Sequence, residues 1–164
     1  MDRTTKILIG IGVGALLLLG GGVTIVAIDK ARARKLLGDA FASVGLPREW
    51  GIALGIVESD LTSTATNLTG PDGARGGAWG LTQITEKTAR GIGYTGPMSR
   101  LLEDPTLAAT LSAKLASQGK PKTIDDLGAW WNAGRFTAAA LPEEHVTKRI
   151  YIPKLRAALT RAQG

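Results

Sequence analysis

The sequence predicts an all-α domain preceded by one apolar segment long enough to cross a membrane. Residues 7–28 contain no charged residue. Over most of the remaining chain, apolar residues recur at helical intervals, and prolines and glycines stand where helices would begin and end. With 164 residues, the chain is long enough for one domain with its own hydrophobic core.

The uncharged stretch 7–28 is expected to form a transmembrane helix behind a short tail, residues 1–6, because about 20 apolar residues suffice to cross a bilayer. A cleaved signal peptide is the alternative, since Arg3 and Lys6 resemble its charged leader and the glycines at 20–22 could form a cleavage site. A buried core helix fits poorly with charges at both ends. The GxxxG pattern at 10–14 suggests pairing of such helices, and so oligomerisation through the span.

The net charge of +6 is concentrated beside the apolar stretch. Residues 1–35 carry six basic and two acidic residues, whereas residues 36–164 carry 14 and 12. A basic cluster next to a membrane segment suits anionic lipid headgroups. The membrane is therefore an expected partner, and nucleic acid is not.

Residues 29–45 are predicted to form a basic juxtamembrane helix that leads into a catalytic domain at 46–164. Gly45 is the expected stop of this helix. The next helix, 47–58, is apolar on nearly every side and should be central. Residues 59–79 are rich in Ser, Thr, Gly and Asn, with at most a short hairpin in 65–80.

Four further helices are expected downstream, each with a start or stop signal. Their expected bounds are Thr85 to about Gly91, Pro105 to Gly119, Thr123 to Gly134, and Pro142 onward. Asp104 can cap the second of them, and Thr123 with Asp126 resembles a capping box for the third. Pro153 must kink the last helix or divide it.

The composition excludes several kinds of site. The chain has no cysteine, which removes disulfides, thiolate zinc sites and cysteine nucleophiles. His145 is the only histidine, so neither a histidine metal cluster nor a convincing Ser-His-Asp triad is available. We expect His145 to be a surface residue, and we expect no metal or cofactor.

Glu58 is the candidate catalytic residue. Apolar surroundings disfavour a carboxylate and raise its pKa, and the negative end of a helix dipole acts in the same direction. Such an acid can donate a proton near neutral pH, as a glycosidase general acid must. The ordinary alternative is that Glu58 is a solvent-exposed glutamate at the end of a helix. The residues downstream of Glu58 favour the catalytic role.

Four short blocks occur in order: Glu58-Ser59, 80–84, 102–105 and 130–134. They resemble the lytic transglycosylase family of the goose-lysozyme-like superfamily, whose members carry Glu-Ser, Gly-Leu-Met-Gln-Ile, Leu-x-Asp-Pro and Ala-Tyr-Asn-Ala-Gly. The resemblance covers about residues 37–157. This chain departs from the family at Thr82 (usually Met), at Trp131 (usually Tyr) and in a longer interval from Glu58 to Gly80.

The resemblance implies a lysozyme-like α-domain that cleaves the β-1,4 bond between N-acetylmuramic acid and N-acetylglucosamine in peptidoglycan. Glu58 would protonate the leaving oxygen and then take the proton of the muramyl C6 hydroxyl, which closes a 1,6-anhydro ring. This route needs no second carboxylate, unlike hydrolysis with two carboxyl groups. Asp60, the nearest second carboxylate, is expected to be a turn residue.

Five other residues are candidates for binding substrate. The resemblance implies that Gln83 and Asn132 bond N-acetyl groups or orient Glu58. Ser59 would bond the substrate or stabilise the helix end. Trp131 and Tyr151 would stack on sugar rings or fill the core.

The expected setting is a membrane-anchored, phage-encoded enzyme that opens the wall during entry or lysis, located in a virion membrane or in a bacterial inner membrane and facing the wall. More basic residues follow residues 7–28 than precede them, so the positive-inside rule conflicts with that orientation in a cell. The Gly-rich stretch also resembles the releasable anchors of certain phage endolysins. The alternatives in function are a hydrolytic goose-type muramidase and a non-catalytic membrane protein that binds glycan.

Overall fold

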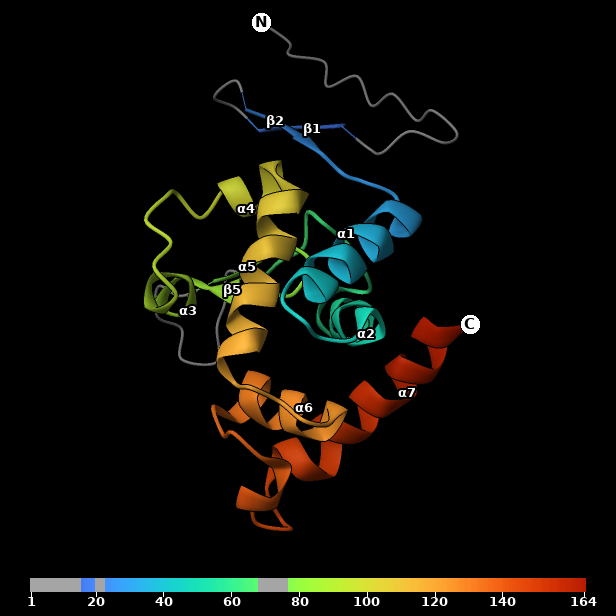
Figure 1. Ribbon diagram of the computed structural model, residues 1–164. Coiled ribbons are helices and arrows are strands. Elements are labelled where there is room, and N and C mark those ends of the chain that lie inside the picture. Colours follow the sequence, from blue (N-terminus) through green and yellow to red (C-terminus); the bar gives the residue numbers. More distant parts are fainter. Residues whose placement is uncertain (1–15, 20–22, 68–76) are drawn as a thin grey trace, which may run out of the picture.

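The computed structural model describes residues 16–19, 23–67 and 77–164, and this part of the chain is mostly helical, as expected (Figure 1). The prediction of a mainly α-helical domain is thus confirmed. The α-helices are α1 (Lys30–Ser43), α2 (Arg48–Ser59), α3 (Glu86–Gly91), α4 (Arg100–Glu103), α5 (Pro105–Gln118), α6 (Ile124–Ala133) and α7 (Ile152–Gln163). A 3₁₀ turn (Ala138–Ala140) and a π-helix (Thr147–Tyr151) lie between α6 and α7.

A small antiparallel sheet lies between α2 and α3. It consists of β3 (Thr66–Asn67), β4 (Ala78–Trp79) and β5 (Ile84–Thr85), paired in that order. The expected hairpin within 65–80 is confirmed by the pairing of β3 with β4. Strand β5 was not expected, because two residues are too few to carry an alternating pattern.

The expected helix over 7–28 is wrong at the residues that the structure describes. Residues 16–19 and 23–26 are instead the antiparallel strands β1 (Leu16–Leu19) and β2 (Val23–Val26). Three successive glycines disfavour a continuous helix, and the β-branched run from Val23 to Val26 suits a strand. Residues 27–28 are in neither a helix nor a strand. The remaining part of that stretch, including 10–14, lies outside the described residues. No helix within the described ranges is both long and apolar enough to span a bilayer.

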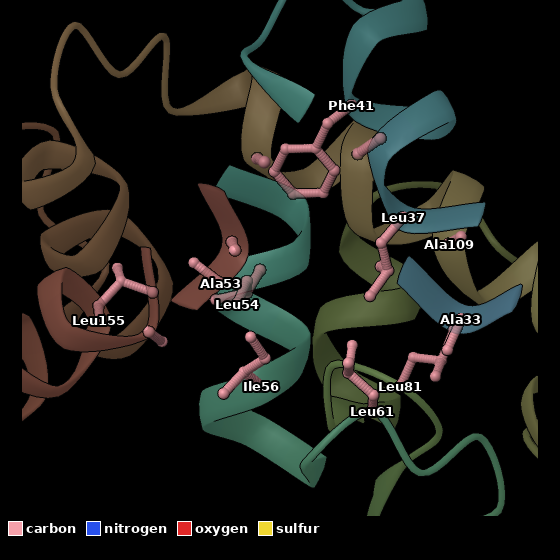
Figure 2. Packing of buried hydrophobic residues seen from close by; sticks show 14 of the residues in the cluster. Ala33, Leu37, Phe41, Ala53, Leu54, Ile56, Leu61, Leu81, Ala109 and Leu155 are labelled. Atoms are coloured by element: carbon pink, nitrogen blue, oxygen red, sulfur yellow. The ribbon is translucent and has the colours of Figure 1, made fainter. Parts of the chain in front are cut away.

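Helix α2 occupies the centre of the domain, packed against α1 on one side and α7 on another (Figures 1 and 2). Leu37 and Phe41 from α1, Leu54 from α2 and Leu155 from α7 are all fully buried in one cluster. Because α1 supplies part of this core, the segment from residue 30 onward packs as one unit with the helices that follow it.

Local capping signals set the bounds of α5 and α6 as expected. The Asp104 carboxylate accepts the Leu107 amide at 3.0 Å, and Thr123 and Asp126 form a reciprocal capping box. Gly134 ends α6 in the left-handed region, with φ 63°. These ends depend on residues close in sequence, which is why a pattern could predict them.

The expected helix start at Pro142 is wrong. Residues 142–145 form a turn, and His145 Nδ1 accepts the Thr147 amide at 3.2 Å where the helical segment begins. Pro153 was expected to kink the helix or divide it. The helical run continues through this point and changes from the π-helix, which ends at Tyr151, to α7, with Pro153 in its first turn. Proline has no N–H to donate to the preceding turn, so it is tolerated at this position.

The contact between α1 and α2 requires a glycine at position 51. A Cβ atom there would lie 2.5 Å from the Phe41 ring and 2.8 Å from the Leu37 carbonyl oxygen. Alanine is the better helix former by about 1 kcal/mol, but overpacking of this kind costs about 1–3 kcal/mol. We therefore predict that Gly51→Ala lowers the free energy of unfolding in urea titrations. At Gly91, the last residue of α3, an added Cβ atom would have no other atom within 4 Å. Gly91→Ala should therefore leave the free energy of unfolding unchanged or raise it. Equal effects of the two substitutions would contradict the packing argument.

Candidate active site

Glu58 lies in the last turn of α2, half-buried, where Tyr151 reaches it from the end of the π-helix. The Tyr151 hydroxyl donates a hydrogen bond to Glu58 Oε1. The two residues are 93 positions apart in sequence. The bond therefore joins the end of α2 to the π-helix that leads into α7.

Burial raises the pKa of Glu58 from 4.5 to about 7, and the hydrogen bond from Tyr151 opposes that shift. Burial and the neighbouring Glu58 charge raise the pKa of Tyr151, so its hydroxyl stays protonated and remains a donor. At neutral pH the Glu58 carboxyl is divided between its protonated and ionised forms. A group in that condition can both donate and accept a proton.

Ser59 connects the end of α2 to the segment at 80–84. Its hydroxyl donates to the Leu81 carbonyl at 2.7 Å and accepts the Thr62 amide at 3.2 Å. Ser59 was expected either to bond the substrate or to stabilise the helix end, and these bonds are of the second kind. The serine keeps Glu58 next to the loop that carries Gln83.

Gln83 lies in a tight turn just before β5, with a left-handed φ of 52°. Its side-chain nitrogen donates to the carbonyls of Ala65 and Gly80, each at 3.0 Å. The amide group thus joins the residue just before β3 to the residue just after β4. A non-glycine residue at positive φ is uncommon and often marks a functional turn.

Thr82 is buried against α5. Its hydroxyl lies 2.6 Å from the Ser112 hydroxyl, and Ser112 also donates to the Ala108 carbonyl at 2.7 Å. Both side chains are almost fully buried. Each buried hydroxyl therefore has a partner.

Asn132 is connected to the Glu58–Tyr151 pair through the π-helix. Its Oδ1 accepts a 2.6 Å hydrogen bond from the hydroxyl of Thr147, a buried residue. Thr147 is the first residue of the π-helix that ends at Tyr151. Thr147 was not among the expected site residues, although π-helical turns occur frequently at functional sites.

Trp131 lines two adjoining hollows of about 300 Å³ and 90 Å³, which share Thr88, Leu115 and Trp131. Trp130 and Gly134 complete the larger hollow, and Gln83, Ile84 and Thr85 the smaller one. Glu58 is not among these lining residues. The predicted site residues thus form two groups, Glu58 with Tyr151 and Gln83 with Trp131. Asn132 links the two groups, since it follows Trp131 in sequence and bonds Thr147 at the start of the π-helix that ends at Tyr151.

Asp60 is turned away from Glu58. It ends α2 in the left-handed region with φ 52°, forms an ion pair with Lys30, and has a side chain that is 70% exposed. Burial and Tyr151 are the causes of the Glu58 pKa shift, and no carboxylate of the described residues adds to it. Within the same residues, no three acidic or histidine side chains gather into a group that could hold a metal ion.

The pKa of Glu58 predicts a pH dependence of stability. Between pH 4.5 and about 7 the folded protein keeps a proton that the unfolded chain releases, so this stabilisation is complete below pH 4.5 and is lost as pH rises through 7. We expect the unfolding free energy of the protein to fall by about 2–3 kcal/mol relative to Glu58→Gln between pH 4 and pH 8. Urea titrations at both pH values measure this, with Glu49→Gln in the first turn of α2 as the control. Parallel pH profiles for the protein and Glu58→Gln would refute the assignment.

Comparisons of this chain with models of protein families, with curated proteins and with solved structures found no match. A function for this chain is therefore inferred from its residues and their geometry.

Proposed function

We propose that this chain is a peptidoglycan lytic transglycosylase in which Glu58 is the single general acid and base. The observation that carries the proposal is a half-buried carboxyl with a pKa of about 7, held by the Tyr151 hydroxyl at the end of a central helix. The order of the four sequence blocks supports the same function. The proposal includes a lysozyme-like architecture, which the helical domain with a small sheet beside α2 supports.

The reaction needs two proton transfers, and one group with a pKa near 7 can perform both. Protonated Glu58 gives its proton to the glycosidic oxygen as the bond from that oxygen to muramyl C1 breaks. The ionised Glu58 then accepts the proton of the C6 hydroxyl while O6 bonds to C1. The products are a 1,6-anhydromuramyl end and a free 4-hydroxyl on N-acetylglucosamine, and Glu58 is protonated again.

Tyr151 suits this cycle because its hydroxyl bonds the carboxylate form of Glu58. That bond lowers the pKa which burial has raised, so the proton is released more readily than from a buried carboxyl alone. Asn132 and Thr147 hold the π-helix that presents Tyr151. In this proposal Tyr151 and Asn132 act as positioning residues, and the hollow at Trp131 and Gln83 is the candidate place for sugar rings.

The hydrolytic alternative uses a second carboxylate or an activated water. Asp60 is the nearest acid in sequence, and its ion pair with Lys30 and its exposure argue against that role. The lack of a role for Asp60 favours the transglycosylase reaction, in which the muramyl C6 hydroxyl closes the ring, over hydrolysis by a goose-type muramidase. A non-catalytic glycan-binding protein would have no use for a carboxyl tuned to neutral pH.

The proposal locates the enzyme at a membrane that faces a cell wall, in a phage particle or a bacterial envelope. Its support is the sequence alone, in the uncharged stretch 7–28 and the basic residues that follow it. Recovery of the intact chain in the membrane fraction after a carbonate wash is the expected result. Recovery of a chain shortened at its N-terminus would point to a cleaved signal peptide.

We predict that Glu58→Gln abolishes wall cleavage, because the amide keeps the shape of the side chain but cannot transfer the proton. General acid–base catalysis contributes about 10²–10⁴-fold, so the rate of release of soluble muropeptides should fall at least that far. Mass spectrometry of the fragments made by the unmodified full chain should show 1,6-anhydromuramyl ends.

Glu49→Gln is the matched control on the same helix and should keep full activity. Reducing ends in place of anhydro ends would select the hydrolytic alternative. Strong residual activity in Glu58→Gln would move the acid to another residue, and inactivity of the unmodified chain would favour a glycan-binding role.

A further inference from the structure

His145 contributes three polar groups to the start of the helical segment that carries Tyr151. Its imidazole Nδ1 accepts the Thr147 amide at 3.2 Å. Its backbone N–H donates to the Pro142 carbonyl at 3.1 Å, and its carbonyl accepts the Arg149 amide at 3.0 Å. The backbone of His145 is therefore fixed on both sides, and its half-buried ring lies where it can receive the Thr147 N–H.

Thr147 begins the π-helix, and all of its polar groups have partners. The residue is 1% exposed. Its hydroxyl donates to Asn132 Oδ1, its N–H donates to His145, and its carbonyl accepts the Ile152 amide. A buried backbone N–H without an acceptor costs about as much free energy as a lost hydrogen bond. Loss of the imidazole acceptor would therefore disturb the first residue of the π-helix.

The π-helix connects the position of Thr147 to that of Tyr151. Tyr151 is the last residue of this five-residue helix, and its hydroxyl donates to Glu58. The bond from the Ile152 amide to the Thr147 carbonyl closes the turn that contains both residues. A shift of Thr147 would therefore change where the Tyr151 hydroxyl lies relative to the Glu58 carboxyl.

Only the neutral form of His145 can accept the Thr147 amide. In a neutral imidazole one ring nitrogen accepts a hydrogen bond, whereas both nitrogens carry a proton in the imidazolium ion. Histidine side chains change charge between pH 5 and pH 8. The bond between His145 and Thr147 is therefore sensitive to pH in the range where an enzyme of this kind would work.

The charged residues around His145 come from its own segment and from α6 and α7, the helices that contact the π-helix. Those of its own segment are Glu143 and Lys148, which pair with each other, and the exposed Glu144 and Arg149. Those of the two helices are Asp125 and Arg156, which pair with each other, Asp126, which accepts two backbone amides, and the exposed Lys154 and Arg161. No carboxylate of the described residues bonds the imidazole, so the bond that protonation breaks is the one to Thr147.

We propose that neutral His145 is a positioning residue for Tyr151, and that its protonation lowers the activity of the site as pH falls. The inference rests on the proposed function and adds a regulatory step to it. The imidazolium ion releases the Thr147 N–H, the π-helix loosens at its start, and Tyr151 bonds Glu58 less often. The proton cycle of Glu58 explains a loss of activity as pH rises through about 7, but gives no reason for a loss at lower pH. A loss on the acid side would belong to His145.

The test compares wall cleavage by the full chain with that by His145→Asn and His145→Ala at pH 5.5 and pH 7. Asparagine offers an amide oxygen close to the position of Nδ1, so it keeps an acceptor that does not titrate, and alanine removes the acceptor. One hydrogen bond corresponds to about a three- to tenfold change in a population, so the unmodified chain should release muropeptides that much more slowly at pH 5.5. His145→Asn should keep the rate of pH 7 at both values, and His145→Ala should show the low rate at both.

Glu49→Gln, in the first turn of α2, removes another titrating group and should keep the acid-side loss. An acid-side loss that persists in His145→Asn would overturn the inference, and so would a His145→Ala variant as active at pH 7 as the unmodified chain. Equal losses in the two histidine variants at pH 7 would assign His145 a packing role and overturn it too.

Fluorine NMR tests the same inference without any cleavage. The chain has two tyrosines, Tyr94 and Tyr151, so labelling with fluorotyrosine gives two signals. In Glu58→Gln the side chain no longer titrates, while its amide oxygen can still accept from Tyr151. The Tyr151 signal of this variant should move between pH 7 and pH 5.5, whereas the Tyr94 signal should stay. Adding His145→Asn should abolish the movement.

The NMR measurement distinguishes failure of this inference from failure of the proposed function. If the unmodified chain cleaves no glycan at either pH, the proposed function fails and the fluorine signals alone decide the inference. A Tyr151 signal that does not move with pH, or that moves equally after His145→Asn, would refute the coupling between His145 and Tyr151.

Discussion

The hydrogen bond between Tyr151 and Glu58 is the contact on which the candidate site depends. A carboxyl group withdrawn from water loses much of its hydration, and without a donor it would hold its proton too tightly to release it. Tyr151 supplies that donor from the far end of the chain. The remaining contacts of the site serve mainly to bring these two side chains together and to hold them there.

The first requirement is a central helix surrounded closely enough to exclude water from its last turn. Gly51 allows the backbone of α1 to approach α2, and the side chains of α1 and α7 enclose the apolar residues between them. The same packing that stabilises the domain raises the pKa of Glu58. The same packing therefore sets both the folding stability and the pKa of Glu58. We expect the protein to be most stable at low pH, where Glu58 is protonated.

The second requirement is an irregular segment before α7. A continuous α-helix from Pro142 would present other side chains to Glu58, whereas the π-helix ends at Tyr151 and Thr147 fixes its start on Asn132. Pro153 is compatible with this arrangement because the α-helical pattern begins just before it. The polar residues of the sequence blocks thus act largely as a scaffold, with Ser59 and Gln83 bonded to backbone carbonyls.

The sequence by itself determined the bounds of α5 and α6, the central place of α2 and the choice of Glu58 as an acid in apolar surroundings, because caps, glycines and apolar periodicity act within a few residues. Only the tertiary structure decided that Tyr151 bonds Glu58 and that Thr147 bonds Asn132, since the residues of these pairs lie 93 and 15 positions apart in the chain. It also decided between strand and helix at 16–19 and 23–26. A short apolar run satisfies either form, and only the pairing partner distinguishes them.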